Sequence, residues 1–520
     1  MRTRKLEQIK QENWDIIIVG GGITGAGILR EAANSGLKVL LVEQKDFSWG
    51  TSSRSTKMIH GGLRYLKSGD VILTYKSVRE RENLLNELPG LAKNNAFILP
   101  VYKGKRFQKW LIHIGLIIYN ILAWKWRKNI FPKKELLKLT PSIKQNGFQA
   151  GFLVNDGVTD DARLVLRVLD EAIDKGATAI NYCKVTKLLK SNNNKVNGVN
   201  LKDMETSESF DLKSKLVINA TGAWVDNLRS EIKKSNSLKI RPLRGSHLIL
   251  SKDRIPLKHN FLTMHPKDNR PVTILLWEGR ILLGTTDKDH KNNMNEEASI
   301  TKEEIDYLLE AINNIFPKLE IKKNDIIATI SGVRPVVDSG KKDPSKESRD
   351  YAIWKEDGLL TVTGGKLTTF RITALDALKQ AKKYIGELSN IEKNKNIFSD
   401  YDKTIIKSIL KKEQVIRLQG RYGRHFSEII KNAQDNELKL IPNTNTIWAE
   451  LRYAAKNESI VHLDDLMLRR TRIGLLLNNG GSDILSKVKK ICQPLLGWND
   501  EKWQKEVDRY LEIWKKYYSF

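Results

Sequence analysis

Three glycines and a later glutamate form the first group of residues whose types and spacing suit a chemical task. Gly20, Gly22 and Gly25 occur in the order G-x-G-x-x-G, and Glu43 follows them in the chain. The first glycine permits a tight turn, the second lets a pyrophosphate approach the backbone, and the third lets a helix pack closely on a strand. An acid about twenty residues after such glycines can accept hydrogen bonds from ribose hydroxyls. The spacing therefore predicts a dinucleotide site.

Positioning these residues requires a strand, a helix and a second strand. Residues 15–19 (DIIIV) form an apolar, β-branched run that is typical of a strand buried on both faces. A helical segment follows and ends at Ser35-Gly36, where the glycine suits the left-handed position just past a helix. Residues 38–43 form the second buried strand. The phosphates would lie at the helix N-terminus, whose free N–H groups and dipole favour negative charge. This context favours a dinucleotide unit over an accidental glycine turn.

Later glycine-rich turns indicate that the chain returns to the same sheet. Residues 219–222 (NATG) end a buried strand, at the edge where ligands of open α/β sheets bind. Residues 358–370 combine a strand, a Gly-Gly turn and a helix start. This late return favours FAD over NAD, and the hydroxyl-rich segment 46–67 suits a second phosphate and ring contact. We expect FAD to contact Gly20, Gly22, Gly25, Glu43, Thr51, Ser52, Ser53, Gly61, Gly62, Val185, Ala220, Thr221, Gly222, Gly365, Lys366, Leu367 and Thr368.

The predicted fold class is α/β, with a Rossmann-like FAD-binding domain, an antiparallel-sheet substrate domain and a C-terminal helical domain. Short β-type runs with turns dominate the region from about residue 236 to 350, and charged helical segments dominate the end of the chain. We assign residues 14–90, 151–235 and 351–385 to the FAD-binding domain, 91–150 and 236–350 to the substrate and membrane-facing domain, and 386–520 to the helical domain.

Composition limits the range of partners. The 520 residues carry a formal net charge of +28, which suits nucleic acid, an anionic membrane surface or acidic substrates. The lysines are scattered, so a solvated basic surface accounts for much of this charge. A nucleic-acid partner is not expected, because it would need a continuous basic surface with exposed aromatics. Cys183 and Cys492 form no CxxC pair, which argues against a disulfide framework or a metal site and favours a reducing compartment.

Two segments suggest contact with a membrane. Residues 110–126 form the longest apolar run, which is short for a spanning helix and contains His113 and Asn120. We expect a core or interfacial helix there. In the terminal helix, Trp503, Val507, Tyr510, Trp514 and Tyr517 recur at helical spacing beside basic residues. Such helices suit an anionic lipid interface, although domain packing produces the same stripe and is slightly favoured here. No apolar signal core precedes the first strand.

A series of motifs in a fixed order resembles a known family. These motifs are Ser53 to Leu66, Asn219 to Gly222, Gly284 to Asp287, Ser331 to Pro335, Arg349 to Tyr351, Gly364 to Thr369 and Asp464 to Leu475. Together they resemble the aerobic, respiratory FAD-dependent glycerol-3-phosphate dehydrogenase family over nearly the whole chain. The resemblance implies oxidation of sn-glycerol 3-phosphate to dihydroxyacetone phosphate. A hydride would pass from C2 to the flavin, and the electrons would pass onward to a membrane quinone.

Segments that other members of the family have and this chain lacks indicate its electron acceptor and its location. The chain has no obvious insert of the kind found in the longer, oxygen-using oxidases of the family, which favours the dehydrogenase over the alternative, a glycerol-3-phosphate oxidase that produces hydrogen peroxide. It also lacks the calcium-binding extension and targeting segment of the mitochondrial form. We therefore expect a bacterial enzyme that is cytoplasmic and peripheral on the cytoplasmic face of the inner membrane. The oligomeric state stays open, a homodimer being one option.

The substrate's phosphate calls for several fixed cationic donors. Arg334 and Arg349 match the family's substrate-binding arginines, and Arg64 and Lys366 could reach the phosphate or hydroxyls. These cations argue against an amine or amino-acid substrate. Any single arginine could instead form a surface or interdomain ion pair. Lys366 has a second potential role, because a positive charge beside the flavin ring raises its reduction potential.

Departure of a hydride from C2 requires a base for the C2 hydroxyl proton, with a pKa near neutral. Of the eight histidines, His60 and His247 lie in motifs that carry the resemblance. His60 is the first choice for the base and His247 the second. Either could instead hold its loop by hydrogen bonds. Tyr65 and Asp287 are expected to bond the substrate or orient the base, unless they only pack their loops.

Overall fold

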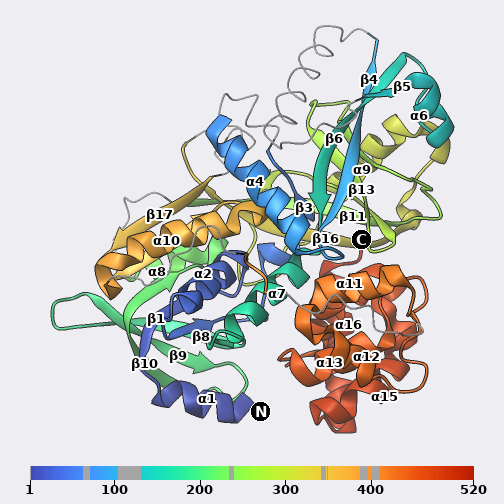
Figure 1. Ribbon diagram of the computed structural model, residues 1–520. Helices are drawn as coiled ribbons and strands as arrows, with labels where there is room; N and C mark the ends of the chain where they lie inside the picture. The colour runs from blue at the N-terminus through green and yellow to red at the C-terminus, as the bar shows by residue number, and fades with distance from the viewer. Residues whose placement is uncertain are drawn as a thin grey trace.

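The predicted dinucleotide unit forms in the computed structural model (Figure 1) as β1 (Trp14–Val19), α2 (Ile23–Asn34) and β2 (Val39–Val42). The two strands are parallel, from the pair Ile16 and Val39 to the pair Val19 and Val42. Both are buried, as their continuous apolar runs predict. The structure describes residues 2–62, 71–103, 130–232, 239–340, 347, 350–386, 396–399 and 410–520.

Within these residues, eight strands form the first sheet, in the order β17-β18-β10-β1-β2-β7, with β9 on β10 and β8 on β9. Strands β10 and β18 run parallel to β1, so the three carboxyl ends meet at one edge. Helix α2 packs between α10 and α7 (Figure 1). The elements added here are β7 (Thr178–Ile180), β8 (Cys183–Lys190), β9 (Val196–Asp203), β10 (Ser209–Asn219), β17 (Tyr351–Glu356), β18 (Leu359–Gly364), α7 (Asp161–Ile173), α8 (Val225–Arg229) and α10 (Phe370–Ile385).

Ten described strands form a second, mostly antiparallel sheet, in the order β15-β11-β14-β13-β12-β4-β6-β3, with β16 on β11 and β5 on β6. Strand β6 runs across the predicted domain limit at residues 150 and 151, because it pairs with β4 along its length. The strands are β3 (Met58–Ile59), β4 (Lys93–Tyr102), β5 (Ile130–Pro132), β6 (Phe148–Val158), β11 (Ile240–Ser251), β12 (Asn260–Met264), β13 (Pro271–Trp277), β14 (Arg280–Gly284), β15 (Lys288–Asp289) and β16 (Ile326–Val337).

The second sheet is covered on both faces. Along β11, Leu248 and Leu250 point to a core shared with α9 (Lys302–Ile315), whereas Ile249 points to a core shared with the C-terminal helices. This alternation follows from the two-residue period of a strand. Among the described residues before the C-terminal region, the remaining longer helices are α1 (Arg2–Gln11), α4 (Val71–Glu87) and α6 (Lys133–Leu139). Helix α1 buries Leu6 and Ile9 in the core under β8, β9 and β10.

The C-terminal region is helical, and the expected fold class is confirmed. It contains α11 (Lys412–Tyr422), α12 (Phe426–Lys431), α13 (Trp448–Asn457), the π-helix η8 (Asp465–Arg470), α14 (Ile473–Leu476), α15 (Leu485–Leu496) and α16 (Asp500–Tyr517). In α16, Trp503, Tyr510 and Trp514 are buried in the core shared with the second sheet. The Trp514 indole N–H donates to the Gly474 carbonyl at 2.8 Å. The aromatic stripe of this helix is therefore packing surface.

The other predicted membrane segment, residues 110–126, lies outside the described residues. In the part of the chain that the structure describes, no helix has the length and apolar character needed to cross a bilayer.

Candidate FAD and substrate site

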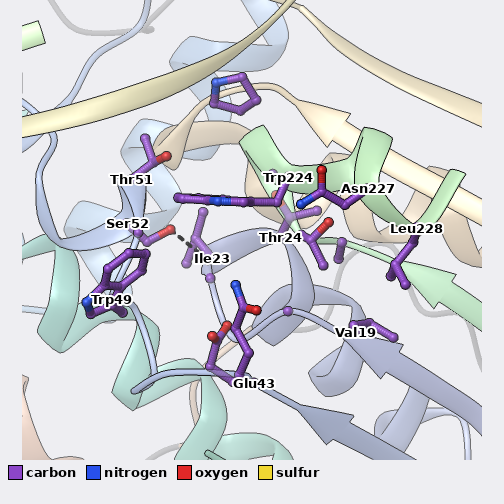
Figure 2. A pocket seen from close by; sticks show the side chains of 18 of the residues that line it. Val19, Ile23, Thr24, Glu43, Trp49, Thr51, Ser52, Trp224, Asn227 and Leu228 are labelled. Carbon is purple, nitrogen blue, oxygen red and sulfur yellow. Dashed lines mark hydrogen bonds between the residues drawn. The ribbon is translucent and has the colours of Figure 1, made fainter. Parts of the chain in front are cut away.

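A cavity of about 420 Å³ lies at the carboxyl edge of the first sheet. Figure 2 shows its wall, with Glu43 at the end of β2 and Trp224 and Leu228 on the segment that follows β10. Of the residues predicted to contact FAD, those lining it are Gly20, Gly22, Glu43, Thr51, Ser52, Val185, Ala220, Thr221, Gly222, Gly365, Lys366 and Leu367. The rest, Gly25, Ser53, Gly61, Gly62 and Thr368, are not among the lining residues.

Each of the three motif glycines is required, or favoured, for a different local reason. Gly20 has a φ of +115°, and a Cβ added there would lie 2.6 Å from the Ala220 carbonyl oxygen. A Cβ on Gly25 would lie 1.9 Å from the Gly20 carbonyl oxygen, so Gly25 lets α2 pack on the turn. At Gly22 the nearest atom to an added Cβ is the Ser52 hydroxyl oxygen, at 3.1 Å. Gly22 is thus less crowded than Gly20 and Gly25, and the lack of a side chain leaves room for a pyrophosphate to approach.

The ends of α2 and β2 supply polar groups that fit FAD. The Ile23 N–H, in the first turn of α2, donates to the Ser52 hydroxyl at 2.9 Å. The helix dipole favours an anion at this end of α2. The Glu43 carboxylate accepts from the N–H groups of Gly21 at 2.7 Å and Lys45 at 2.8 Å. Burial raises the pKa of Glu43 and outweighs these bonds. An acceptor held at this edge suits the ribose hydroxyls.

A pair of tryptophans forms a wall of the cavity that the sequence reasoning missed (Figure 2). The rings of Trp49 and Trp224 lie 5.8 Å apart, centroid to centroid, and are tilted by 49°. The Trp49 indole donates to Glu297 at 2.9 Å, and the Trp224 indole donates to the Met294 carbonyl at 2.8 Å. Trp49 lies within the segment 46–67 and Trp224 lies two positions after the 219–222 turn, both of which were already assigned to FAD, and these positions were the available signal.

Further lining residues were also missed. They are Val19, Ile23, Thr24, Gln44, Gly50, Ser55, Cys183, Lys184, Thr186, Asn227, Leu228, Glu231, Pro335, Gly364, Phe370 and Thr373. Most of them flank a predicted residue by one or two positions.

Arg334, on β16, is not among the cavity-lining residues, and its side chain lies in a polar group with Thr285 and Asp287. Its guanidinium donates to the Thr285 hydroxyl at 2.8 Å and to Asp287 at 3.1 Å. A Cβ on Gly245 would lie 2.0 Å from this guanidinium, so the glycine leaves room for it. Asp287 also binds Arg270 at 2.7 Å. The Asp287 carboxylate therefore orients arginines, and the neighbour of Arg334, Pro335, lines the cavity.

His247 is fully buried near Arg334. Its Nε2 lies 3.0 Å from the Thr56 hydroxyl. Burial holds the pKa of His247 well below its ordinary value, and the charges of Arg334 and Lys57 lower it further. The ring is therefore neutral at pH 7.

His60 is half-buried beside the turn that carries Lys366. The backbone N–H of His60 donates to the Thr368 hydroxyl at 3.1 Å, and the backbone N–H of Gly61 donates to Asp156 at 3.0 Å. Burial lowers the pKa of His60, with the Asp156 carboxylate opposing and Lys366 assisting this shift. Both candidate bases are thus neutral, but only His60 is partly open.

Three predicted residues, Arg64, Tyr65 and Arg349, lie outside the described residues, and their roles stay predictions. Within the described ranges, no group of three or more His, Cys, Asp or Glu side chains could hold a metal ion.

Comparisons with known proteins give the family of the chain. Residues 15–371 match the model of the FAD dependent oxidoreductase family, and residues 382–503 match that of the C-terminal domain of alpha-glycerophosphate oxidase. The chain is 36% identical over 499 residues to an aerobic glycerol-3-phosphate dehydrogenase of Staphylococcus aureus, covering 91% of this chain and 89% of the relative. An aerobic glycerol-3-phosphate dehydrogenase of Staphylococcus haemolyticus is 35% identical over 495 residues, covering 89% and 88%.

Solved structures show the same fold. A glycerol-3-phosphate dehydrogenase of Bacillus halodurans complexed with FAD has a TM-score of 0.78 at 24% identity, covering 98% of this chain and 97% of that one. The L-alpha-glycerophosphate oxidase of Mycoplasma pneumoniae with FAD bound has a TM-score of 0.58 at 19% identity, covering 75% and 99%. With the motifs, the cavity and these relatives together, the chain belongs to the FAD-dependent glycerol-3-phosphate dehydrogenase family, and its cofactor is FAD.

Proposed function

We propose that this protein oxidises sn-glycerol 3-phosphate to dihydroxyacetone phosphate and passes the electrons to a membrane quinone. The observation that supports this substrate is the guanidinium of Arg334, which Thr285 and Asp287 hold in place one residue before Pro335, a residue of the cavity wall. Arginine suits phosphate because its planar fork donates two parallel hydrogen bonds. The Staphylococcus aureus relative, named for this substrate, supports the same assignment.

The residues divide the work of the reaction. The Gly20–Gly25 turn and the N-terminus of α2 would hold the pyrophosphate of FAD, and Glu43 would hold its ribose. Bound FAD supplies the hydride acceptor for substrate C2. Arg334 would hold the substrate phosphate, and His60 would take the C2 hydroxyl proton as the hydride leaves. Lys366, which lines the cavity, would stabilise negative charge that develops there.

The electron acceptor and the location belong to the proposal. A membrane quinone as acceptor requires contact with a membrane, for which we propose the cytoplasmic face, and the net charge of +28 supports adsorption to anionic lipid. The competing function is that of an oxidase that reduces oxygen to hydrogen peroxide. The likeness in fold to the Mycoplasma pneumoniae oxidase is compatible with this alternative.

Anaerobic titration of the holoenzyme with sn-glycerol 3-phosphate, followed by the visible flavin absorbance, tests the proposal. We expect bleaching that a quinone analogue reverses and that air reverses only slowly. Rapid reversal by air with peroxide release would establish the oxidase. If the flavin absorbance does not bleach, sn-glycerol 3-phosphate is not the substrate.

Replacing Arg334 by methionine is expected to lower kcat/KM for sn-glycerol 3-phosphate by roughly 30-fold or more. The variant removes the cation that pairs with the bound substrate phosphate, and loss of one partner of such a desolvated pair costs about 2–5 kcal/mol. In this variant, inorganic phosphate should also no longer compete with sn-glycerol 3-phosphate for binding. The matched control is Arg270→Met, which removes the other partner of Asp287. It should cost at most about fivefold, as a partly exposed ion pair does. Equal losses in both variants would show that Arg334 acts only through Asp287.

The pH profile should report a base with a lowered pKa. A base accepts a proton only when it is unprotonated, so kcat/KM falls as pH falls through its pKa. Because the pKa of His60 is lowered, this acid limb should lie below about pH 6.5, the ordinary histidine value. Lys366→Met removes a charge that disfavours protonation, so the limb should move to higher pH. A limb that stays in place would exclude His60 as the group that titrates, since Lys366 does not act on His247 in this way.

A further inference from the structure

The cavity wall formed by residues 46–55 begins with a carboxylate that the C-terminal region binds. Asp46 is fully buried and accepts from Arg469 Nε at 2.5 Å. It also accepts from the two terminal nitrogens of Arg470 at 2.6 and 2.7 Å. Both arginines lie in the π-helix η8, more than 400 positions later in the chain. Asp46 itself is not among the lining residues, whereas Trp49, Gly50, Thr51 and Ser52 are.

The turn that starts at Asp46 has a strained backbone that needs support. Ser48 has a φ of +64°, in the left-handed region that non-glycine residues adopt at a cost. The Trp49 N–H donates to the Asp46 carbonyl at 3.0 Å, and the Ser48 N–H donates to the Gly21 carbonyl at 2.9 Å. The Asp46 side chain therefore anchors a turn that presents Trp49 to the cavity and touches the glycine-rich loop.

A second contact fixes the far end of this wall. Arg472 donates to the Ser53 carbonyl at 2.7 Å. The Asp161 carboxylate accepts from the Ser55 N–H at 2.9 Å and from its hydroxyl at 2.8 Å. Arg472 lies 3.3 Å from the same carboxylate. The C-terminal region thus touches both ends of the segment.

The opposite wall is bound by the same region. Residues 183–186 line the cavity, and Asn181 and Tyr182 directly precede them. The Asn181 amide donates to Asp46 at 2.9 Å and to the Ser459 carbonyl at 3.0 Å. The Tyr182 hydroxyl donates to Asp465 in η8 at 2.7 Å. One C-terminal segment therefore joins two cavity walls that are far apart in sequence.

The ion pairs around Asp46 form a cluster of acids and arginines in equal number. Arg469 binds Asp464 and Asp465, each at 2.6 Å, in addition to Asp46, and Arg509 binds Asp464. With Arg470, three buried acids face three arginines. Removing one member would leave a buried charge without its partner, so the cluster forms as a unit and docks the segment in one position.

We propose that the C-terminal segment 458–472 is a positioning element for FAD, which fixes the two cavity walls through Asp46 and Tyr182. Its arginines bind behind the walls and act through the backbone that the walls present. Tight binding of FAD then requires the C-terminal region to be docked. This inference concerns the cofactor alone, so it stands or falls independently of the substrate and the acceptor.

The test compares two carboxylates that each face two C-terminal arginines, the fully buried Asp46 and Glu278, whose side chain is 11% exposed. Asp46→Asn weakens the bonds from η8, whereas Glu278→Gln weakens those from Arg417 and Arg421 in α11, away from the cavity. The full chain is stripped of FAD, its thermal unfolding is recorded, and the dissociation constant for FAD is measured by flavin fluorescence. We expect Asp46→Asn to raise this constant by about tenfold or more, as loss of hydrogen bonds to a charged group does. Glu278→Gln should change it by less than about twofold, with a similar loss of thermal stability.

Tyr182→Phe supplies a milder variant, because it deletes only the bond to Asp465. It should fold, raise the dissociation constant about threefold and speed release of FAD from the holoenzyme. Equal FAD affinities in Asp46→Asn and Glu278→Gln would overturn the proposal. If Asp46→Asn yields no folded protein, an unchanged constant in Tyr182→Phe would overturn it in the same way.

Discussion

Replacing His60 by glutamine is expected to lower kcat by about 10²- to 10⁴-fold, the usual contribution of a positioned general base. The His60 ring is half-buried and neutral at pH 7, so it can receive the C2 hydroxyl proton. Its backbone is held by Thr368, two residues past the cavity residue Lys366. Glutamine keeps the size and a hydrogen-bonding end of the side chain but cannot take a proton. The rate of anaerobic flavin bleaching measures the loss, and the dissociation constant for FAD should stay unchanged.

His247→Gln is the matched comparison. His247 is fully buried, and its Nε2 already faces the Thr56 hydroxyl, so its replacement should disturb packing more than proton transfer. We expect a fall in stability and a smaller fall in the bleaching rate. If His247→Gln abolishes bleaching while His60→Gln retains it, the two roles are reversed.

Local sequence features were enough to predict residues that line one cavity. The Gly20–Gly25 turn, Glu43 and the turn at Thr221 each depend on residues adjacent in sequence, and the parallel strands bring their carboxyl ends to one edge. The alternation along β11 also follows from a local period. Patterns of this kind are visible in a single sequence because each side chain's environment is set by its own strand or turn.

Long-range pairings were not predictable in the same way. Trp49 and Trp224 are 175 positions apart, and Glu297 and the Met294 carbonyl hold their indoles from a third segment. Asp46 is paired with arginines from the opposite end of the chain. In both cases the residue type is compatible with several partners, and only the tertiary fold selects one.

The stripe along α16 shows the same limit. Trp503, Tyr510 and Trp514 at helical spacing suit a lipid surface as well as a protein core. Which of these covers the stripe depends on the second sheet, whose strands lie more than 150 residues earlier. The structure decides for the core, so the terminal helix no longer supports attachment to a membrane through these three rings.

Gly25→Ala is expected to lower the free energy of unfolding of the FAD-free protein by more than about 3 kcal/mol, beyond the usual cost of overpacking a core. The new methyl group would lie 1.9 Å from the Gly20 carbonyl oxygen, which is backbone and cannot rotate away. Gly20 is itself fixed, because its N–H donates to the Val42 carbonyl at 2.8 Å and its α-carbon faces the Ala220 carbonyl. Either α2 must lift from the sheet or the turn must open, and both changes dismantle the anion site.

Gly22→Ala should separate cofactor binding from folding. Its methyl group would meet only the Ser52 hydroxyl at 3.1 Å, and its φ of −82° is open to any residue. The FAD-free protein should therefore unfold within about 1 kcal/mol of wild type, while the methyl group occupies the space that the pyrophosphate needs. Urea unfolding without FAD and titration with FAD distinguish the two glycines. If Gly25→Ala unfolds like wild type and loses only FAD affinity, then Gly25 acts on the cofactor directly and the packing argument fails.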